Sequence, residues 1–290
     1  MLLEGRKEEQ GSVALKMNAG GVIRIGKKDF CTGGKPYVMG ILNLTPDSFS
    51  DGGSYEDTDK ALFAVERMMK DGADIIDVGG ESTRPGYIMI SAGEEIARTC
   101  FVIEAIKERF EVPVSLDTYK AEVAEAGILA GADMINDIWG LKYDDRMAGI
   151  VAKHDKAVCL MHNREKAVYN DLIEDVISDI KECVSIAEAH GIKRDRMIID
   201  PGIGFAKSSE ECLRVINEMD RLKDIGLPVL LGASRKSCIG NTLNLPVDER
   251  EEGTIALSVM GLVRGATFFR VHDVKKNRRA LDMAWAVMNA

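Results

Sequence analysis

Short apolar runs alternate with longer amphipathic stretches along the chain from residue 37 onward. Each run is bounded by Gly, Pro, Asn or Asp, which is typical of buried strands. In the stretches between the runs, apolar residues recur every three or four positions, as they do on one face of a helix, and several stretches end in Gly. The alternation predicts repeated βα units. The predicted strands cover residues 37–43, 74–79, 112–117, 132–137, 157–162, 196–201, 227–232 and 267–272.

Eight units of about 32 residues each fit a (β/α)₈ TIM barrel of typical size. A doubly wound open sheet would alternate in the same way, so the polar residues must decide between the two folds. Nearly every unit carries reactive side chains at the end of its strand. An open sheet gathers ligands mainly at one switch point, whereas a barrel brings all eight strand ends to one mouth. We therefore predict one α/β domain, a TIM barrel over residues 21–290, after a loose, polar arm over residues 1–20.

Composition narrows the class of protein. The chain has 290 residues, of which 46% are hydrophobic and 29% charged, so it can bury a sizeable core. Its net charge of −9 disfavours nucleic acid and anionic membranes as partners. It has no apolar run of membrane-spanning length and no secretory signal at its start, so we expect a cytoplasmic protein. Six cysteines without Cys-x-x-Cys spacing indicate reduced thiols rather than a zinc site.

Two loops near the start of the barrel carry candidate chemistry. The loop NLTPDSFSDGG, residues 43–53, is long for a βα connection and suggests a functional loop over the site, although a surface turn has a similar composition. The loop GGESTRPG, residues 79–86, holds Thr83 and Arg84 before Pro85. An Arg beside paired glycines suits phosphate, with an ordinary solvated Arg as the alternative.

Polar residues at later strand ends point to one pocket. Asp117, Asn136 and Asp200 end the third, fourth and sixth predicted strands. Each alone could cap the following helix, but three at one mouth imply a pocket that binds hydrogen-bond donors. Lys236 and Ser237 lie at a predicted helix start, which favours a bound anion, unless the residues only begin the helix.

The last strand adds a second anion site. With period 2, Arg270 and His272 lie on one face and form a clamp with Arg84. His162 reads better as a structural histidine than as a catalytic one, and Lys207 has a weaker claim still. The G-x-G-x-x-G pattern of dinucleotide sites is missing, which disfavours a nicotinamide enzyme.

Seven motifs, in this order, closely resemble the dihydropteroate synthase family of pterin-binding barrel enzymes: ILNLTPDSFSDGG, IIDVGGESTRPG, VSLDT, INDIWG, IIDPGIGFAK, ASRKSCIG and RVHDV. The resemblance spans residues 36–290. It implies a transferase of folate biosynthesis that condenses 6-hydroxymethyl-7,8-dihydropterin diphosphate with 4-aminobenzoate to 7,8-dihydropteroate, with Mg²⁺ as cofactor. It also implies a homodimer and a target of sulfonamides.

The resemblance assigns a role to each candidate residue. The pterin would be held by Asp117, Asn136, Asp200 and Lys236, and Mg²⁺ by Asn43. The diphosphate would be received by Thr83, Arg84, Arg270 and His272. The aminobenzoate site would be built from Phe49, Asp51, Pro85, Phe205 and Ser237. Of these, Asp117, Lys236, Arg270 and His272 are the expected catalytic residues. One departure stands at 161–164, where this chain reads Met-His-Asn-Arg and many members read Met-His-Met followed by Gly and Pro.

The expected chemistry is a dissociative, SN1-like loss of diphosphate, because the electron-rich ring can share the positive charge of the methylene carbon. Asp117 would stabilise that cation. Two other functions share the barrel: a methyltetrahydrofolate corrinoid methyltransferase, and a catalytically silent pterin-binding barrel. Neither needs groups that hold a leaving diphosphate, so Arg84, Lys236 and Arg270 argue against both.

Overall fold

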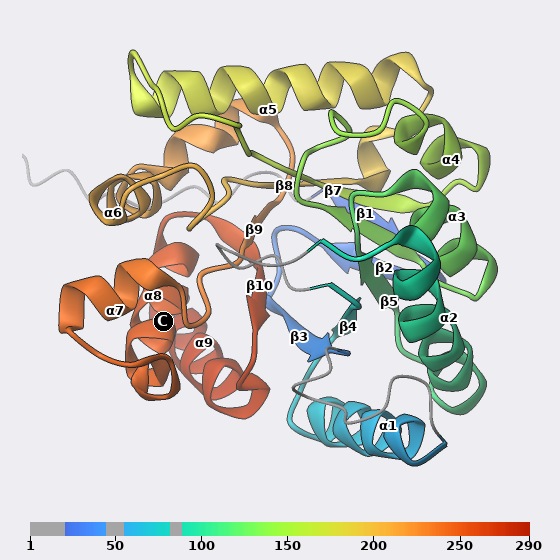
Figure 1. Ribbon diagram of the computed structural model, residues 1–290. Coiled ribbons are helices and arrows are strands. Elements are labelled where there is room, and N and C mark those ends of the chain that lie inside the picture. Colours follow the sequence, from blue (N-terminus) through green and yellow to red (C-terminus); the bar gives the residue numbers. More distant parts are fainter. Residues whose placement is uncertain (1–20, 45–54, 82–88) are drawn as a thin grey trace, which may run out of the picture.

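The described chain forms a closed barrel of eight parallel strands surrounded by helices (Figure 1). The structure is a computed structural model and describes residues 21–44, 55–81 and 89–290. Strand order around the barrel is β10-β3-β4-β5-β6-β7-β8-β9, so the strands follow one another in chain order and the last pairs with the first. The prediction of a TIM barrel is confirmed, and the open-sheet alternative is wrong.

The eight barrel strands lie within two residues of the predicted ones. Strand ends are well marked in this sequence because each apolar run stops at Gly, Pro or a polar residue that cannot continue a buried strand. Their bounds are β3 (Tyr37–Asn43), β4 (Ile75–Gly79), β5 (Val114–Asp117), β6 (Met134–Asp137), β7 (Ala157–Met161), β8 (Met197–Asp200), β9 (Val229–Leu231) and β10 (Ala266–Val271).

The helices cover the outside of the barrel. Several begin with side-chain caps, as at Ser91, Asp171 and Ser208, whose oxygens accept backbone N–H groups of the first turn. Their bounds are α1 (Tyr55–Lys70), α2 (Ala92–Arg109), α3 (Ala121–Leu129), α4 (Met147–Lys153), α5 (Leu172–Ala189), α6 (Ser209–Asn217), α7 (Ser237–Leu243), α8 (Glu251–Val263) and α9 (Val274–Met288), with short 3₁₀ turns η1 (Arg194–Arg196), η2 (Met219–Ile225) and η3 (Val247–Glu249). Within the described ranges, every helix is too short or too polar to cross a membrane.

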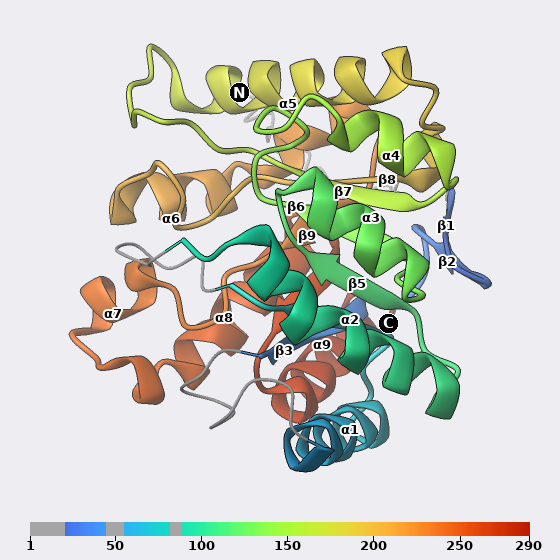
Figure 2. The same cartoon turned by 45° about the vertical axis from the view of Figure 1, so that its right-hand side comes forward.

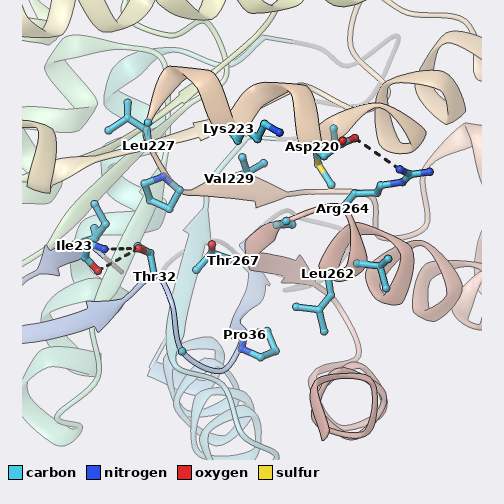
Figure 3. Close-up of a pocket in the computed structure, with 18 of the residues that line it drawn as sticks. Ile23, Thr32, Pro36, Asp220, Lys223, Leu227, Val229, Leu262, Arg264 and Thr267 are labelled. Carbon is cyan, nitrogen blue, oxygen red and sulfur yellow. Dashed lines mark hydrogen bonds and ion pairs between the residues drawn. The ribbon is translucent and has the colours of Figure 1, made fainter. Parts of the chain in front are cut away.

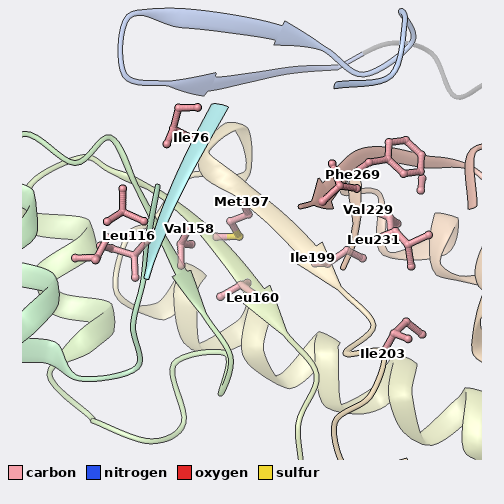
Figure 4. Close-up of a cluster of buried hydrophobic side chains, with 14 of the residues drawn as sticks. Ile76, Leu116, Val158, Leu160, Met197, Ile199, Ile203, Val229, Leu231 and Phe269 are labelled. Atoms are coloured by element: carbon pink, nitrogen blue, oxygen red, sulfur yellow. The ribbon is translucent and has the colours of Figure 1, made fainter. Parts of the chain in front are cut away.

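The outward face of each strand packs against these helices. Alternate strand residues point away from the barrel axis, and those of neighbouring strands form one continuous apolar surface under the helices. Figure 4 shows a part of this core, with Ile76, Leu116, Val158, Ile199 and Leu231 labelled among others. The outer core fixes the positions of the strands, and the strands in turn fix the side chains that point inward.

The inward face changes character along the strands. Near the amino ends of the strands the interior is filled by fully or almost fully buried apolar side chains: Met39, Ile75, Met134, Ala157, Ile198, Leu230 and Phe268. One or two inward positions further along, the side chains become polar: Asp77, Ser115, Asp117, Asn136, Asp200 and Arg270. Since successive inward residues of a strand are about 6.6 Å apart, the polar layer lies directly above the apolar one, toward the carboxyl ends of the strands.

A small antiparallel hairpin closes the apolar end of the barrel. Strands β1 (Val22–Ile25) and β2 (Lys28–Cys31) pair with each other, and Ile23, Ile25 and Phe30 pack into the apolar interior layer. In Figure 2 the hairpin stands at the right, beside one end of the barrel. The sequence pattern predicted a folded domain from residue 21 onward but not this hairpin. The alternation of Ile23 and Ile25 before a Gly-Lys turn was the available signal.

Candidate active site

A row of side chains from four neighbouring strands meets at the carboxyl end of the barrel. Asn43, Gly79, Asp117 and Asn136 are direct register partners from β3 to β6. The position that a Cβ would take at Gly79 lies 3.7 Å from Asn43 Oδ1 and 3.9 Å from Asp117 Oδ2, so both oxygens face the same space. A side chain at position 79 would fill it. The glycine therefore leaves room for a ligand between two oxygen donors.

Arg270 joins this row to a carboxylate deeper in the barrel. Its Nε donates to Asp77 Oδ2 at 2.6 Å, and its Nη2 donates to Asp117 Oδ2 at 2.5 Å. Burial opposes the charge on Arg270, but the two carboxylates outweigh burial and raise the pKa of the guanidinium above its usual value. Burial also raises the pKa of Asp117 to about 7, against the opposing effect of Arg270. The guanidinium thus stays charged and is held at two points.

Asp200 and Lys236 form the opposite side of the mouth. Asp200 is buried, and its Oδ1 accepts the backbone N–H of Gly202 at 2.7 Å, which orients the carboxylate. Burial raises the pKa of Asp200 to about 6. Lys236 Nζ lies 4.1 Å from the centre of the Phe205 ring, and burial lowers the pKa of this lysine to about 8. A buried acceptor and a donor beside an aromatic face suit a flat, polar heterocycle.

Gly204 allows the loop after β8 to approach Lys236. It has φ of 82°, in the left-handed region, and a Cβ at this residue would lie 2.9 Å from Lys236 Cδ. Any other residue would be strained in this backbone conformation and would collide with the lysine stem. The Gly-Ile-Gly sequence after Asp200 is therefore explained by close packing against the site. It does not belong to a G-x-G-x-x-G dinucleotide motif, which the sequence lacks.

His272 follows β10 and is oriented by Ser234. Ser234 Oγ lies 2.9 Å from His272 Nδ1 and accepts the His272 backbone N–H at 3.2 Å. Ser237 is the first residue of α7, as predicted from the sequence, and is exposed. Arg270 and His272 therefore stand at the same end of the barrel, but Arg270 lies inside the polar layer and His272 lies at its edge.

A buried charge network holds the chain on both sides of residues 82–88. Lys120 Nζ donates to Glu81 Oε2 and to Glu95 Oε2, each at 2.7 Å, and to the Ile90 carbonyl at 2.9 Å. Tyr119 donates to the other Glu81 oxygen at 2.7 Å. Glu81 and Ile90 thus share one lysine.

The structure tests the placement of some candidate residues and not of others. It brings together Asn43, Asp117, Asn136, Asp200, Phe205, Lys236, Ser237, Arg270 and His272 at one end of the barrel. Five further candidates lie outside the described residues: Phe49, Asp51, Thr83, Arg84 and Pro85. The expected convergence of the strand-end residues is confirmed for the described ones.

Comparison with known proteins agrees with this geometry. Residues 39–272 match the family model described as pterin binding enzyme. A dihydropteroate synthase of Clostridium beijerinckii is 55% identical over 262 residues, covering 90% of this chain and 97% of the relative. One from Bacillus subtilis is 51% identical, covering 88% and 90%. The chain belongs to the dihydropteroate synthases.

Solved structures of dihydropteroate synthases have closely similar folds. The structure of the Clostridium difficile enzyme, determined in the presence of pteroic acid, has a TM-score of 0.85 and 44% identity, covering 87% of this chain and 97% of that one. The Xanthomonas albilineans enzyme with 4-aminobenzoic acid has a TM-score of 0.87 and 38% identity, covering 93% and 98%. Both likenesses extend over nearly the whole barrel.

The departure from the dihydropteroate synthase pattern after β7 has a structural explanation. His162 is fully buried between Asp179, 3.0 Å from Nε2, and Lys207, 2.7 Å from Nδ1. Burial lowers the pKa of His162 to about 3, so the ring is neutral and structural, as the sequence indicated. Arg164 Nε donates to Asp179 at 2.6 Å and its guanidinium lies over the Tyr169 ring at 4.6 Å. These contacts hold residues 162–164 against α5 and the loop after β8.

Two residues of the mouth were missed by the sequence analysis. Asp77 holds Arg270 from inside the barrel, and Ser234 orients His272. A signal existed for Asp77, since an acidic residue inside an otherwise apolar strand is costly unless a partner compensates its charge. Ser234 precedes Lys236 in a polar loop and carried no such signal.

A separate cavity of about 520 Å³ opens at the other end of the barrel (Figure 3). Its lining includes the first residues of β9 and β10, Val229 and Ala266, together with Leu227 and Leu262. Figure 3 shows Arg264 and Asp220 at its edge, with their charged groups 3.8 Å apart. The lining contains none of the polar residues of the mouth. A cavity of this kind therefore does not by itself mark the chemistry in this fold, where catalytic groups belong to the carboxyl ends of the strands.

Proposed function

We propose that the protein condenses 6-hydroxymethyl-7,8-dihydropterin diphosphate with 4-aminobenzoate to 7,8-dihydropteroate and diphosphate, as a step of folate synthesis. The observation that carries the proposal is the meeting of Asp117, Asn136, Asp200 and Lys236 with the doubly held Arg270 at one mouth. The relatives named above support the reaction, because one structure was solved with pteroic acid and another with 4-aminobenzoic acid.

The pterin is recognised by hydrogen bonds across the mouth. A dihydropterin presents an amino group and ring N–H donors on one edge and acceptors elsewhere. Asp200 accepts two neighbouring donors, Asn136 both donates and accepts, and Lys236 donates to the ring carbonyl. Asp117 Oδ1 is buried and has no hydrogen-bond partner among the residues that the structure describes, so it is available to a ring N–H. Analogues that leave these groups unpaired bind poorly.

The reaction breaks the bond between the methylene carbon and a diphosphate oxygen. Both electrons of that bond leave with diphosphate, and the positive charge left on carbon is shared by the pterin ring and stabilised by the carboxylate of Asp117. Arg270 and His272 stabilise the negative charge that develops on the departing oxygens. Thr83 and Arg84, from the sequence assignment, belong to the same anion site. The result is a dissociative displacement.

The arylamine of 4-aminobenzoate then forms the new C–N bond with its free lone pair. The ammonium product loses its proton to solvent or to the released diphosphate, so no catalytic base is needed. Ser237, exposed at the start of α7, takes the aminobenzoate carboxylate. Phe205, with the sequence-assigned Phe49, Asp51 and Pro85, forms the walls of this subsite and excludes water from the cation.

The residues at the mouth fit Mg²⁺. Asn43 Oδ1 and Asp117 Oδ2 face the same space beside Gly79, and oxygen donors of this kind are what Mg²⁺ prefers. Among the described residues no group of three or more His, Cys, Asp or Glu forms a closed metal cage. That suits an ion that keeps several waters and shares its remaining positions with substrate phosphates. When bound, it would neutralise charge on the leaving diphosphate. We assign Asn43 as its protein ligand.

The proposal extends to assembly and compartment. All six cysteines are free thiols in the structure, in keeping with a reducing compartment, and we assign the protein to the cytoplasm. The family resemblance supports a homodimer in solution.

The reaction is tested by mixing the protein with the pterin diphosphate, 4-aminobenzoate and Mg²⁺ and measuring diphosphate. We expect release that depends on the presence of aminobenzoate and falls when a chelator removes Mg²⁺. A methyltransferase or a silent barrel would release none. Release that ignores aminobenzoate would show a hydrolase and would contradict the proposal.

Pterin affinity should depend on pH through Asp200. The pKa of this carboxyl is raised to about 6, so below pH 6 it is protonated in the free protein and can no longer accept two donors. We expect the Kd of 6-hydroxymethylpterin, which lacks the diphosphate, to rise about tenfold per pH unit below pH 6, in addition to the change that Asp117, whose pKa is about 7, causes nearer neutrality. Calorimetry between pH 4.5 and 7.5 measures it. An affinity that is constant over this range would contradict the role of the carboxylate.

A further inference from the structure

Asp77 is the most deeply placed acidic residue of the polar layer. It lies in the middle of β4, is 0% exposed, and has Ser115 of β5 as its register partner. Its Oδ2 accepts from Arg270 Nε at 2.6 Å, across the intervening strand β3. Its Oδ1 is buried without a hydrogen-bond partner in the described part of the chain. Arg270 is the one described basic side chain that forms a salt bridge with it.

The two carboxylates that hold Arg270 differ in their access to a ligand. Asp117 is level with Gly79 and Asn43, at the mouth, while Asp77 is one inward position deeper. A pterin that donates a hydrogen bond to Asp117 therefore changes one anchor of the guanidinium. Asp77 lies below that level, so a ligand bound at the mouth is expected to leave its bond to Nε in place. The deep anchor is the constant one.

Two hydrogen bonds at different depths fix the orientation of the Arg270 guanidinium as well as its position. Arginine has many rotamers, and a guanidinium held only at Nη2 can still turn as a rigid plane about the Cγ–Cδ and Cδ–Nε bonds and swing along the barrel. A bond at Nε fixes the plane of the fork, which determines where the remaining N–H groups point. Displacement of a catalytic group by about 1 Å can cost about 10²-fold in rate. The direction of those groups matters most when charge develops on the leaving oxygens.

We infer that Asp77 is a positioning residue for the reaction: through its bond to Nε it holds the Arg270 guanidinium in the plane that meets the departing diphosphate. This inference rests on the proposed role of Arg270. Asp77 itself touches no substrate. Its contribution belongs to turnover and not to pterin binding, which depends on Asp117, Asn136, Asp200 and Lys236.

The substitution Asp77→Asn tests this directly, because it keeps the size of the side chain and removes its charge. We expect kcat to fall about tenfold or more, while the Kd of 6-hydroxymethylpterin stays within threefold. Ser115→Ala is the matched control, since it removes the neighbouring buried polar atom without touching Arg270, and it should leave kcat within twofold. An equal loss in kcat and in pterin affinity, or no loss in kcat, would overturn the inference.

A double-mutant cycle shows whether Asp77 acts through Arg270. Lysine at position 270 keeps the positive charge but has no Nε–H of a planar fork. In the Arg270→Lys background, Asp77→Asn should change kcat by less than twofold, so the two effects are strongly non-additive. Additive effects would mean that Asp77 acts by another route.

A measurement on the unmodified protein covers the case in which Asp77→Asn does not fold. In protein labelled with ¹⁵N-arginine, the Arg270 Nε–H signal is identified as the one absent from Arg270→Lys. We expect this proton to exchange slowly with solvent and to remain protected when 6-hydroxymethylpterin is added. Rapid exchange in either state would overturn the inference. A protected proton together with normal turnover of Arg270→Ala would instead refute the proposed role of Arg270.

Discussion

Replacing Arg270 with alanine is expected to lower kcat by about 10²- to 10³-fold, the usual cost of removing one donor to a developing charge. Arg270 donates from inside the polar layer, where it is held by Asp77 at 2.6 Å and Asp117 at 2.5 Å. Its charge matters most as diphosphate departs, so the loss should appear in turnover. Steady-state diphosphate release at saturating substrates measures kcat, and calorimetry with 6-hydroxymethylpterin should give a Kd within about threefold of the original.

The same substitution leaves two buried carboxylates without their shared cation, which costs stability as well as rate. Thermal unfolding of Arg270→Ala therefore has to be measured beside activity. Arg270→Lys serves as the control, because it keeps the charge near Asp117 and loses only the fork. We expect it to turn over faster than Arg270→Ala but slower than the original protein. A folded Arg270→Ala variant with kcat within threefold of the original would exclude Arg270 from the chemistry.

Replacing Asp200 with asparagine is expected to weaken pterin binding about 100-fold. In the proposed function the carboxylate accepts two donors of the heterocycle, and two charge-assisted hydrogen bonds contribute about 3 kcal/mol together. Asparagine has the same shape but presents one donor where an acceptor is needed. The Gly202 N–H at 2.7 Å holds the side chain in place, so the change should be local. Calorimetry with 6-hydroxymethylpterin at pH 7.5 measures the affinity, and the tenfold change per pH unit below pH 6 that Asp200 causes should disappear.

Asp137→Asn is the matched control for Asp200→Asn. Asp137 is also a buried carboxylate at a strand end, and burial raises its pKa to about 6, but its oxygens accept the backbone N–H groups of Trp139 and Leu141. It follows the inward-facing Asn136 and so points away from the barrel interior. Pterin affinity of this variant should match the original protein. Equal losses in the two variants would mean that the effect of Asp200→Asn is structural.

The barrel could be predicted because its determinants are local. Each strand is an apolar run closed by Gly, Pro or a polar residue, and each helix has its own period, so no long-range information is needed to find the units. The β1–β2 hairpin was not predicted because Ile23, Ile25 and Phe30 are buried only by the apolar end of the folded barrel. Its partners come from strands spread over the whole chain.

The same distinction explains the site. Asp117, Asn136 and Asp200 were found because a polar residue at a strand end is visible in the sequence, and the barrel places such residues together. Asp77 was not predicted, because its partner Arg270 is 193 residues away in the sequence. Its acidic side chain inside an apolar strand was nevertheless a signal that a partner must exist. Pairing across a closed barrel follows from shear and side-chain length, which a linear pattern does not contain. Charge in the middle of a strand is the clue to search for in other barrels.

The hairpin below the apolar layer has a consequence for how substrates enter and products leave. Because Ile23, Ile25 and Phe30 close one end of the barrel, the polar layer forms the floor of a site that opens only at the carboxyl ends of the strands. Both reactants and both products then have to pass through the same entrance. With the site as proposed, we expect the bicyclic reactant to bind before the arylamine, because its contacts lie on the floor of the site.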